Sequence, residues 1–151
     1  MGSFDAHFES VYFAAVAGEG CPYTSEELDS AVESELLRAR VKRVEKWIHV
    51  HLFLKTSCMD IMSGADNRHT GYAQMEIAEW CFMATPDHGE KPLSMCSGAK
   101  TGQTTAGKTS KQYLIDSAML PVRRALDDFL VSVVAARDSE RERQKKPSSS
   151  Q

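Results

Sequence analysis

The segment from Gly102 to Thr109 reads GQTTAGKT and matches the phosphate-binding loop pattern G-x-x-x-x-G-K-[ST]. A working loop of this type needs later strands, which complete a parallel sheet and supply an aspartate for Mg²⁺. Only 151 − 109 = 42 residues follow Thr109, and they indicate one long helix and a polar tail. The pattern therefore predicts a loop of Gly, Ser, Thr and Lys residues beside a helix, and nucleotide binding by GQTTAGKT is only a third functional reading.

The composition is that of one domain of ordinary size. The chain has 151 residues and a net charge of −3, and its apolar runs are too short for a membrane span. No basic and apolar secretory leader is visible at the start. The four cysteines, Cys21, Cys58, Cys81 and Cys96, lie far apart and form no C-x-x-C motif, which favours free buried thiols in a reducing compartment. We expect a cytoplasmic protein with no membrane partner.

The first half of the chain predicts two helices and a short strand. Apolar residues over positions 4–16 have the spacing of a first helix. Thr24 and Glu27 form a capping box for a second helix over residues 25–47. Residues 47–55 alternate with period two, which predicts a short strand, although a continuing helix is a live alternative.

The second half predicts two further helices separated by a long loop. Residues 72–84 place their apolar side chains on one helical face, whereas residues 85–108 are rich in Gly and show hardly any periodicity. A last helix begins at Thr109 or Ser110, and Pro121 either kinks it or begins its second part.

The predicted fold class is therefore mainly α. We expect a four-helix bundle with a short extended segment and a long polar loop before the last helix. Residues 1–136 form this single domain, and residues 137–151 form a polar, disordered tail because they are almost all charged or small and polar.

No arrangement of residues identifies a reaction or a metal. The histidines and cysteines lack the paired spacings that hold zinc. A nucleophile pair of Cys81 and His88 stays open, although neither residue has a family signature around it. We therefore expect a protein that is not an enzyme, with no cofactor, no metal and no small-molecule substrate.

Basic residues form the main candidate binding surface. Arg38, Lys42 and Lys46 are spaced by four on the predicted second helix, so they line one ridge that could follow phosphates. Lys108 and Lys111 stand at the end of the Gly-rich segment, where a helix N-terminus suits phosphate contact. An equally good reading of the ridge is a solvated face that pairs with the acidic N-terminal part of this or a neighbouring chain.

The last third of the chain resembles the coat proteins of rod-shaped plant RNA viruses of the tobacco mosaic type. The resemblance rests on residues 115–131 (IDSAMLPVRRALDDFLV) and on the Gly-Ser-Lys-Thr segment SGAKTGQTTAGKTS. It implies a radial four-helix bundle in which Asp116 and Arg123 lie against RNA or pair near it, while Lys108 and Lys111 add phosphate contacts. The Arg-Phe pair of that family is not recognisable here, and Pro121 is unusual at mid-helix.

These observations predict a structural, self-assembling, RNA-binding protein, most concretely a subunit of a helical virus capsid that contacts RNA phosphates without sequence specificity. The alternative is a cytosolic protein-interaction module with a basic helix face.

Overall fold

The computed structural model describes residues 9–45, 50–84 and 93–145, which form a mixed sheet and two helices. In chain order the elements are β1 (Glu9–Ala17), α1 (Ser25–Arg38), β2 (Val41–Val44), β3 (Val50–Met62), β4 (His69–Ala84), β5 (Leu93–Cys96), β6 (Lys100–Gly107) and α2 (Lys111–Lys145).

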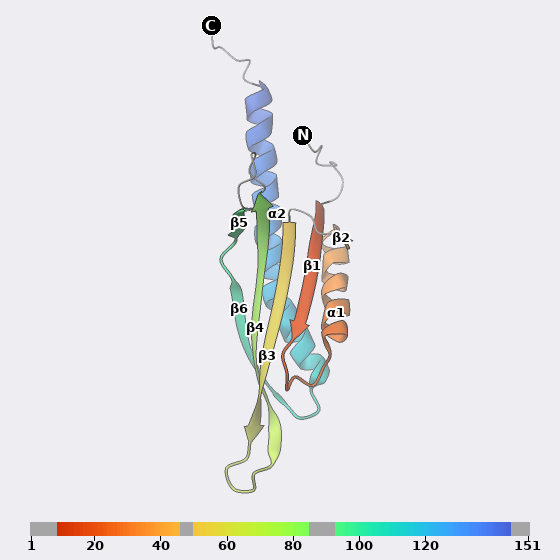
Figure 1. The fold of residues 1–151 in the computed structure, drawn as a ribbon, viewed down its shortest axis with the longest axis vertical. Coiled ribbons are helices and arrows are strands. Elements are labelled where there is room, and N and C mark those ends of the chain that lie inside the picture. Colours follow the sequence, from red (N-terminus) through yellow and green to blue (C-terminus); the bar gives the residue numbers. More distant parts are fainter. Residues whose placement is uncertain (1–8, 46–49, 85–92, 146–151) are drawn as a thin grey trace.

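The sheet has the strand order β2-β1-β3-β4, and β4 pairs along its other side with both β5 and β6. Strand β1 runs parallel to both β2 and β3, whereas every pairing of β4 is antiparallel. Both helices lie behind the sheet in Figure 1, on one of its faces. The β3–β4 hairpin and the C-terminal end of α2 extend beyond the body of the domain at opposite ends.

The hydrophobic core fills the space between the two helices and the sheet. Helix α1 buries Leu28, Val32 and Leu36, which are spaced by four and lie on one helical face. From the sheet and from α2 the core takes Val11, Phe13, Leu52, Leu54, Leu114, Ile115, Ala118, Met119, Val122, Ala125, Leu126 and Phe129. The face of the sheet opposite the helices has no such cover among the described residues.

Helix α1 begins where the sequence predicts and ends earlier. The backbone N–H of Glu27 donates to Thr24 Oγ1 at 3.1 Å, and the Thr24 N–H donates to Glu27 Oε1 at 3.3 Å, so the capping box is confirmed. The helix ends at Arg38 and not near residue 47, because Arg40 takes a left-handed conformation with φ of 57°. Glycine usually fills that position, and its absence hid the helix end.

Helix α2 is a single helix of 35 residues that runs through Pro121. Its start at Lys111 is within two residues of the prediction, and it continues to Lys145 across the boundary that we placed at residues 136 and 137. Neither described helix combines the length and the apolar content needed to cross a bilayer.

The predicted four-helix bundle is wrong, because the described residues contain two helices and a sheet. The described part of the first predicted helix is β1, a strand paired on both sides, whose apolar run cannot be told from a buried helix by periodicity. The predicted third helix is β4, and the predicted loop contains β5 and β6; residues 85–92 lie outside the described residues. The strand expected over residues 47–55 is β3, described from Val50 onward.

The prediction of free thiols is also wrong. Cys21 and Cys58 form one disulfide, which ties the segment after β1 to β3, and Cys81 and Cys96 form another between β4 and β5. The expected cytoplasmic location rested on reduced cysteines, so the two disulfides remove its basis.

Candidate functional site: the open face and free edge of the sheet

The sheet face opposite the helices is partly apolar and open to solvent. Alternate residues of β3 and β4 point to this face, and Met59 and Met75 are 71% and 52% exposed. Ile61 and Ile77 extend the same face, each more than one-third exposed. Large apolar side chains of this exposure gathered on one face indicate an interaction surface more than scattered single residues do.

Strand β4 has an inverted polarity that explains this surface. Its buried, helix-facing side carries Gln74 and Glu76, each 1% exposed, while Met75 and Ile77 lie between and beside them on the open side. A strand with one buried and one exposed face normally buries its apolar residues and exposes its polar ones. The chain therefore satisfies polar groups inside and leaves apolar groups outside.

A shallow groove of about 510 Å³ crosses the open face over β3, β4 and β6. Its lining on that face is formed by Ser57, Met59, Ala73, Met75, Gln103 and Thr105. The flexible and polarisable methionines adapt to varied apolar groups, and the amide and hydroxyls of β6 offer hydrogen bonds. The groove can therefore accommodate an apolar side chain beside a polar backbone.

Strand β6 forms a free edge next to this groove. Among the described residues it pairs with β4 alone, and in Figure 1 it is the left-hand margin of the sheet. Its residues alternate between half-buried and exposed along all eight positions, and no proline or charged residue occurs between Lys100 and Lys108. Natural edge strands are commonly protected by charge, proline or a bulge, so an unprotected edge is a site for strand addition.

Buried hydrogen bonds hold β4 in place beneath the groove. The Tyr23 hydroxyl donates to Gln74 Oε1, and Gln74 Nε2 donates to the Leu114 carbonyl at 2.9 Å. Thr104 Oγ1 donates to Glu76 Oε1 at 2.8 Å, whereas Glu76 Oε2 has no hydrogen-bond partner among the described residues. Tyr23, Gln74 and the Leu114 carbonyl therefore connect the residue before the N-cap of α1, strand β4 and the start of α2.

Burial raises the pKa of Tyr23 above its ordinary value, and the negative charge of Glu76 adds to this, whereas a hydrogen bond with Thr56 acts in the opposite direction. The folded state therefore favours the neutral phenol. The stability that this preference contributes is fully present below pH 10, the ordinary pKa of a tyrosine in the unfolded chain. It is lost as the pH rises through the higher pKa of Tyr23 in the folded state.

We expect Tyr23→Phe to lower the free energy of unfolding by about 1 kcal/mol at pH 7, because Gln74 Oε1 loses a donor in a buried position. The variant should also lose less stability than the wild type between pH 9 and pH 11. Urea denaturation at a series of pH values measures both effects. An unchanged slope of stability against pH in the variant would show that the alkaline loss arises elsewhere.

Three of the basic residues predicted to bind RNA take part in ion pairs on the helix side. Arg123 donates to Glu35 through Nε at 2.9 Å and through Nη2 at 2.8 Å, and this raises the pKa of Arg123. Arg38 Nη1 lies 3.5 Å from Glu35 Oε1. Lys111 Nζ lies 2.7 Å from Glu27 Oε2 and holds the pKa of Glu27 below its ordinary value, so that this pair weakens as the pH falls through the folded-state pKa of Glu27.

The other predicted site residues are scattered. Lys42 lies in β2, Lys108 lies in the turn between β6 and α2, and Asp116 Oδ1 accepts a hydrogen bond from Gln112 at 2.9 Å. Lys46 lies outside the described residues. Lys42 is therefore not on a common helical ridge with Arg38, because α1 ends at Arg38.

The GQTTAGKT segment is a strand followed by a turn. Residues Lys100–Gly107 are extended and pair with β4, and α2 begins only at Lys111. A phosphate-binding loop needs a cradle of backbone N–H groups that opens directly into a helix. The residues of the GQTTAGKT segment instead place small and polar side chains along β6, at the edge of the sheet.

Of the comparisons with known proteins, the one with solved structures gives matches, and these are weak. No protein-family model matches the chain, and no curated protein sequence matches it. The solved structure of rare lipoprotein B from Shewanella oneidensis matches 88% of this chain and 99% of its own, at 16% identity and a TM-score of 0.32. The PelC dodecamer from Paraburkholderia phytofirmans matches 76% and 86%, at 13% identity and a TM-score of 0.39. A minor lipoprotein from Acinetobacter baumannii matches 89% and 92%, at 10% identity and a TM-score of 0.27.

None of these three proteins is a viral coat protein, and TM-scores below 0.5 with such identities carry neither fold nor function to this chain. The fold itself overturns the capsid prediction, because the resemblance implied a four-helix bundle and the chain has a sheet with two helices on one face. The capsid assembly rested on that resemblance and is wrong with it. The RNA partner is wrong as well, because the basic ridge on which it also rested does not exist and Arg38, Lys111 and Arg123 pair with acidic residues. The alternative module with a basic helix face is unsupported, because Lys42 lies in a strand.

Proposed function

We propose that this chain is a non-enzymatic peptide-binding module of an oxidising compartment, which binds an extended segment of a partner protein along β6. The observation that carries the proposal is the free edge of β6 beside an apolar groove on the same sheet. An extended segment can continue the sheet through main-chain hydrogen bonds, while every second side chain enters the groove.

The charges and the disulfides support the same proposal. Lys100 and Lys108 stand at the two ends of β6, so they favour a segment with acidic residues at its ends and apolar residues at alternate positions between them. The two disulfides support a compartment outside the reducing cytosol.

The test uses a library of displayed random peptides selected against the oxidised protein. We expect the selected peptides to have alternating apolar residues, and to lose at least tenfold in affinity for Met75→Lys and Gln103→Lys variants. Leu37→Lys is the matched control, because Leu37 is also an exposed apolar residue and lies on α1, on the opposite side of the sheet. The Leu37→Lys variant should bind the selected peptides with the affinity of the wild type.

The backbone of β6 supplies a second readout. On peptide binding, the amides of residues 101–107 should shift in NMR spectra. Those whose N–H groups point away from β4 should also exchange more slowly with solvent, since these unpaired groups become hydrogen-bonded. Selected peptides that bind Met75→Lys and Gln103→Lys with wild-type affinity, or that perturb α1 and leave β6 unchanged, would overturn the proposal.

A further inference from the structure

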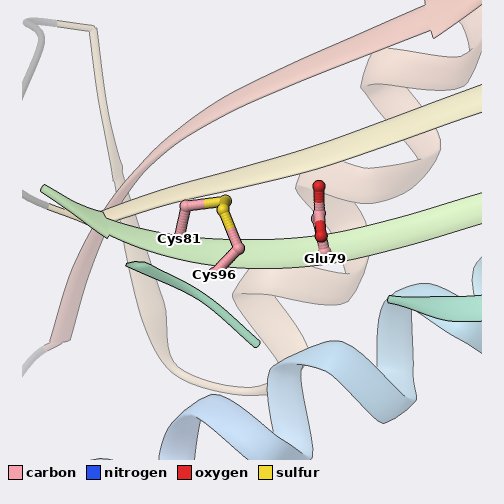
Figure 2. A group of neighbouring side chains, drawn as sticks. All are labelled: Glu79, Cys81 and Cys96. Atoms are coloured by element: carbon pink, nitrogen blue, oxygen red, sulfur yellow. A yellow bond between two sulfur atoms is a disulfide. The ribbon is translucent and has the colours of Figure 1, made fainter. Parts of the chain in front are cut away.

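Three potential metal ligands lie together at the β4–β5 margin of the sheet. Cys81 of β4 and Cys96 of β5 are direct register partners, and Glu79 precedes Cys81 by two residues on the same face of β4. Figure 2 shows the three side chains along β4. One ligand atom from each lies within 4.8 Å of those from the other two. None of the three lines the groove on the lower part of the sheet.

The two disulfides differ in how solvent and reagents reach them. Cys21 and Cys58 are partly buried and pack against the hydrophobic core on the helix side of the sheet. In the other disulfide Cys81 is buried, at 4% exposure, whereas Cys96 is exposed and is the half that a reagent can reach. Strand β5, which carries Cys96, has four residues and pairs with β4 alone in the described part of the chain. Exposed disulfides exchange with thiols more readily than buried ones.

We propose that Cys81, Cys96 and Glu79 form a zinc site in the dithiol form of the protein, and that the disulfide closes this site. Two thiolates and one carboxylate are ligands that Zn²⁺ accepts, and three protein ligands leave the fourth tetrahedral position for water. Glu79 is half-buried and takes part in no ion pair among the described residues, so its carboxylate is available to the metal. The site is independent of the proposed peptide binding.

The opening step is a thiol–disulfide exchange with an external dithiol. The thiolate of the reductant attacks Cys96 Sγ, the Cys81–Cys96 bond breaks, and its electron pair leaves on Cys81 Sγ, which takes up a proton. The second thiol of the reductant then attacks the mixed disulfide, releases Cys96 as a thiol and leaves the reductant as a disulfide. Zinc binding displaces one proton from each cysteine, because only the thiolate is a ligand.

The first experiment measures zinc on the full chain. The protein is reduced with dithiothreitol, desalted under argon, incubated with zinc chloride, desalted again and analysed for metal content. We expect about one zinc per chain for the reduced wild type and none for the oxidised wild type. The reduced Cys81→Ser/Cys96→Ser variant, which retains Cys21 and Cys58, is the matched control and should bind none. Glu79→Gln should weaken zinc binding at least tenfold.

The second experiment measures which disulfide opens first and does not depend on the metal. Limiting dithiothreitol is added to the wild type, free thiols are alkylated, and the labelled cysteines are identified by peptide mass spectrometry. Cys81 and Cys96 should carry the label while Cys21 and Cys58 are still unlabelled. Equal labelling of both pairs, or equal zinc content in the reduced wild type and the reduced Cys81→Ser/Cys96→Ser variant, would overturn the proposal.

Discussion

Replacing Cys21 and Cys58 together by alanine is expected to lower the free energy of unfolding by roughly 4 kcal/mol. The disulfide joins residues 37 positions apart, and the cost of closing a loop of that length in the unfolded chain disappears with the crosslink. The same loop contains all of α1, so the disulfide restricts how α1 can leave the sheet. Urea denaturation of the oxidised variant and the oxidised wild type measures the difference.

The matched control is the Cys81→Ala/Cys96→Ala variant. That disulfide closes a separation of only 15 residues, so its loss should cost less, roughly 3 kcal/mol on the same reasoning. The sulfurs of the first disulfide also make native polar contacts, since Cys21 Sγ lies 3.8 Å from Thr56 Oγ1 and Cys58 Sγ lies 3.9 Å from the Tyr23 hydroxyl. A smaller loss for the Cys21 and Cys58 variant than for the control would contradict the assignment of Cys21–Cys58 as the structural crosslink.

The sequence was most informative where local chemistry alone decides the structure. The capping box of Thr24 and Glu27 uses groups three residues apart, so it could be predicted without any knowledge of the sheet. The apolar face of α2, from Val122 to Phe129, could be predicted for the same reason, since its buried residues recur at i, i+3, i+4 and i+7. The end of α1 could not, because Arg40 adopts the conformation that glycine usually marks.

Strands β4 and β6 could not be recognised, because their polar and apolar residues do not alternate as they do in an ordinary half-buried strand. In β4 the polar residues Gln74 and Glu76 are buried, and Met75 between them is exposed, so alternation of polarity predicts the wrong face. In the described part of the chain β6 is paired on one side, and its Thr, Gln and Gly residues give no apolar alternation. Long-range pairing decides both strands, and a single sequence does not reveal it.

The candidate site was missed for the same reasons. A search for charged or catalytic residues overlooks a free strand edge, because backbone N–H and C=O groups do the binding there. The inverted polarity of β4 was the one available signal, since it could have been read as a strand with an apolar outer face. The register of Cys81 with Cys96 could not be inferred from cysteine spacing, which leaves the pairing of four cysteines open.

Replacing Arg123 by alanine should lower the free energy of unfolding by about 2 kcal/mol, which is the largest stability effect that we expect of any single substitution. Two charge-assisted hydrogen bonds join Arg123 of α2 to Glu35 of α1, and the Glu35 side chain is only 8% exposed. Without Arg123 this carboxylate remains in a poorly solvated position, where Arg38, at 3.5 Å, is its one other ion-pair partner among the described residues. Breaking a fully buried pair costs about 3–5 kcal/mol, and the half-exposed Arg123 reduces that figure.

Arg124→Ala is the matched control, because Arg124 is the next residue of α2 and is exposed. It should change stability by less than about 0.5 kcal/mol. In the Arg123→Ala background, Glu35→Gln should recover part of the loss, since it removes the uncompensated charge and keeps the shape of the side chain. Equal effects of the two arginine substitutions would contradict the assignment of Arg123 as a structural residue. A loss confined to Arg123, with recovery by Glu35→Gln, would mean that the arginine once predicted to bind RNA holds α1 against α2.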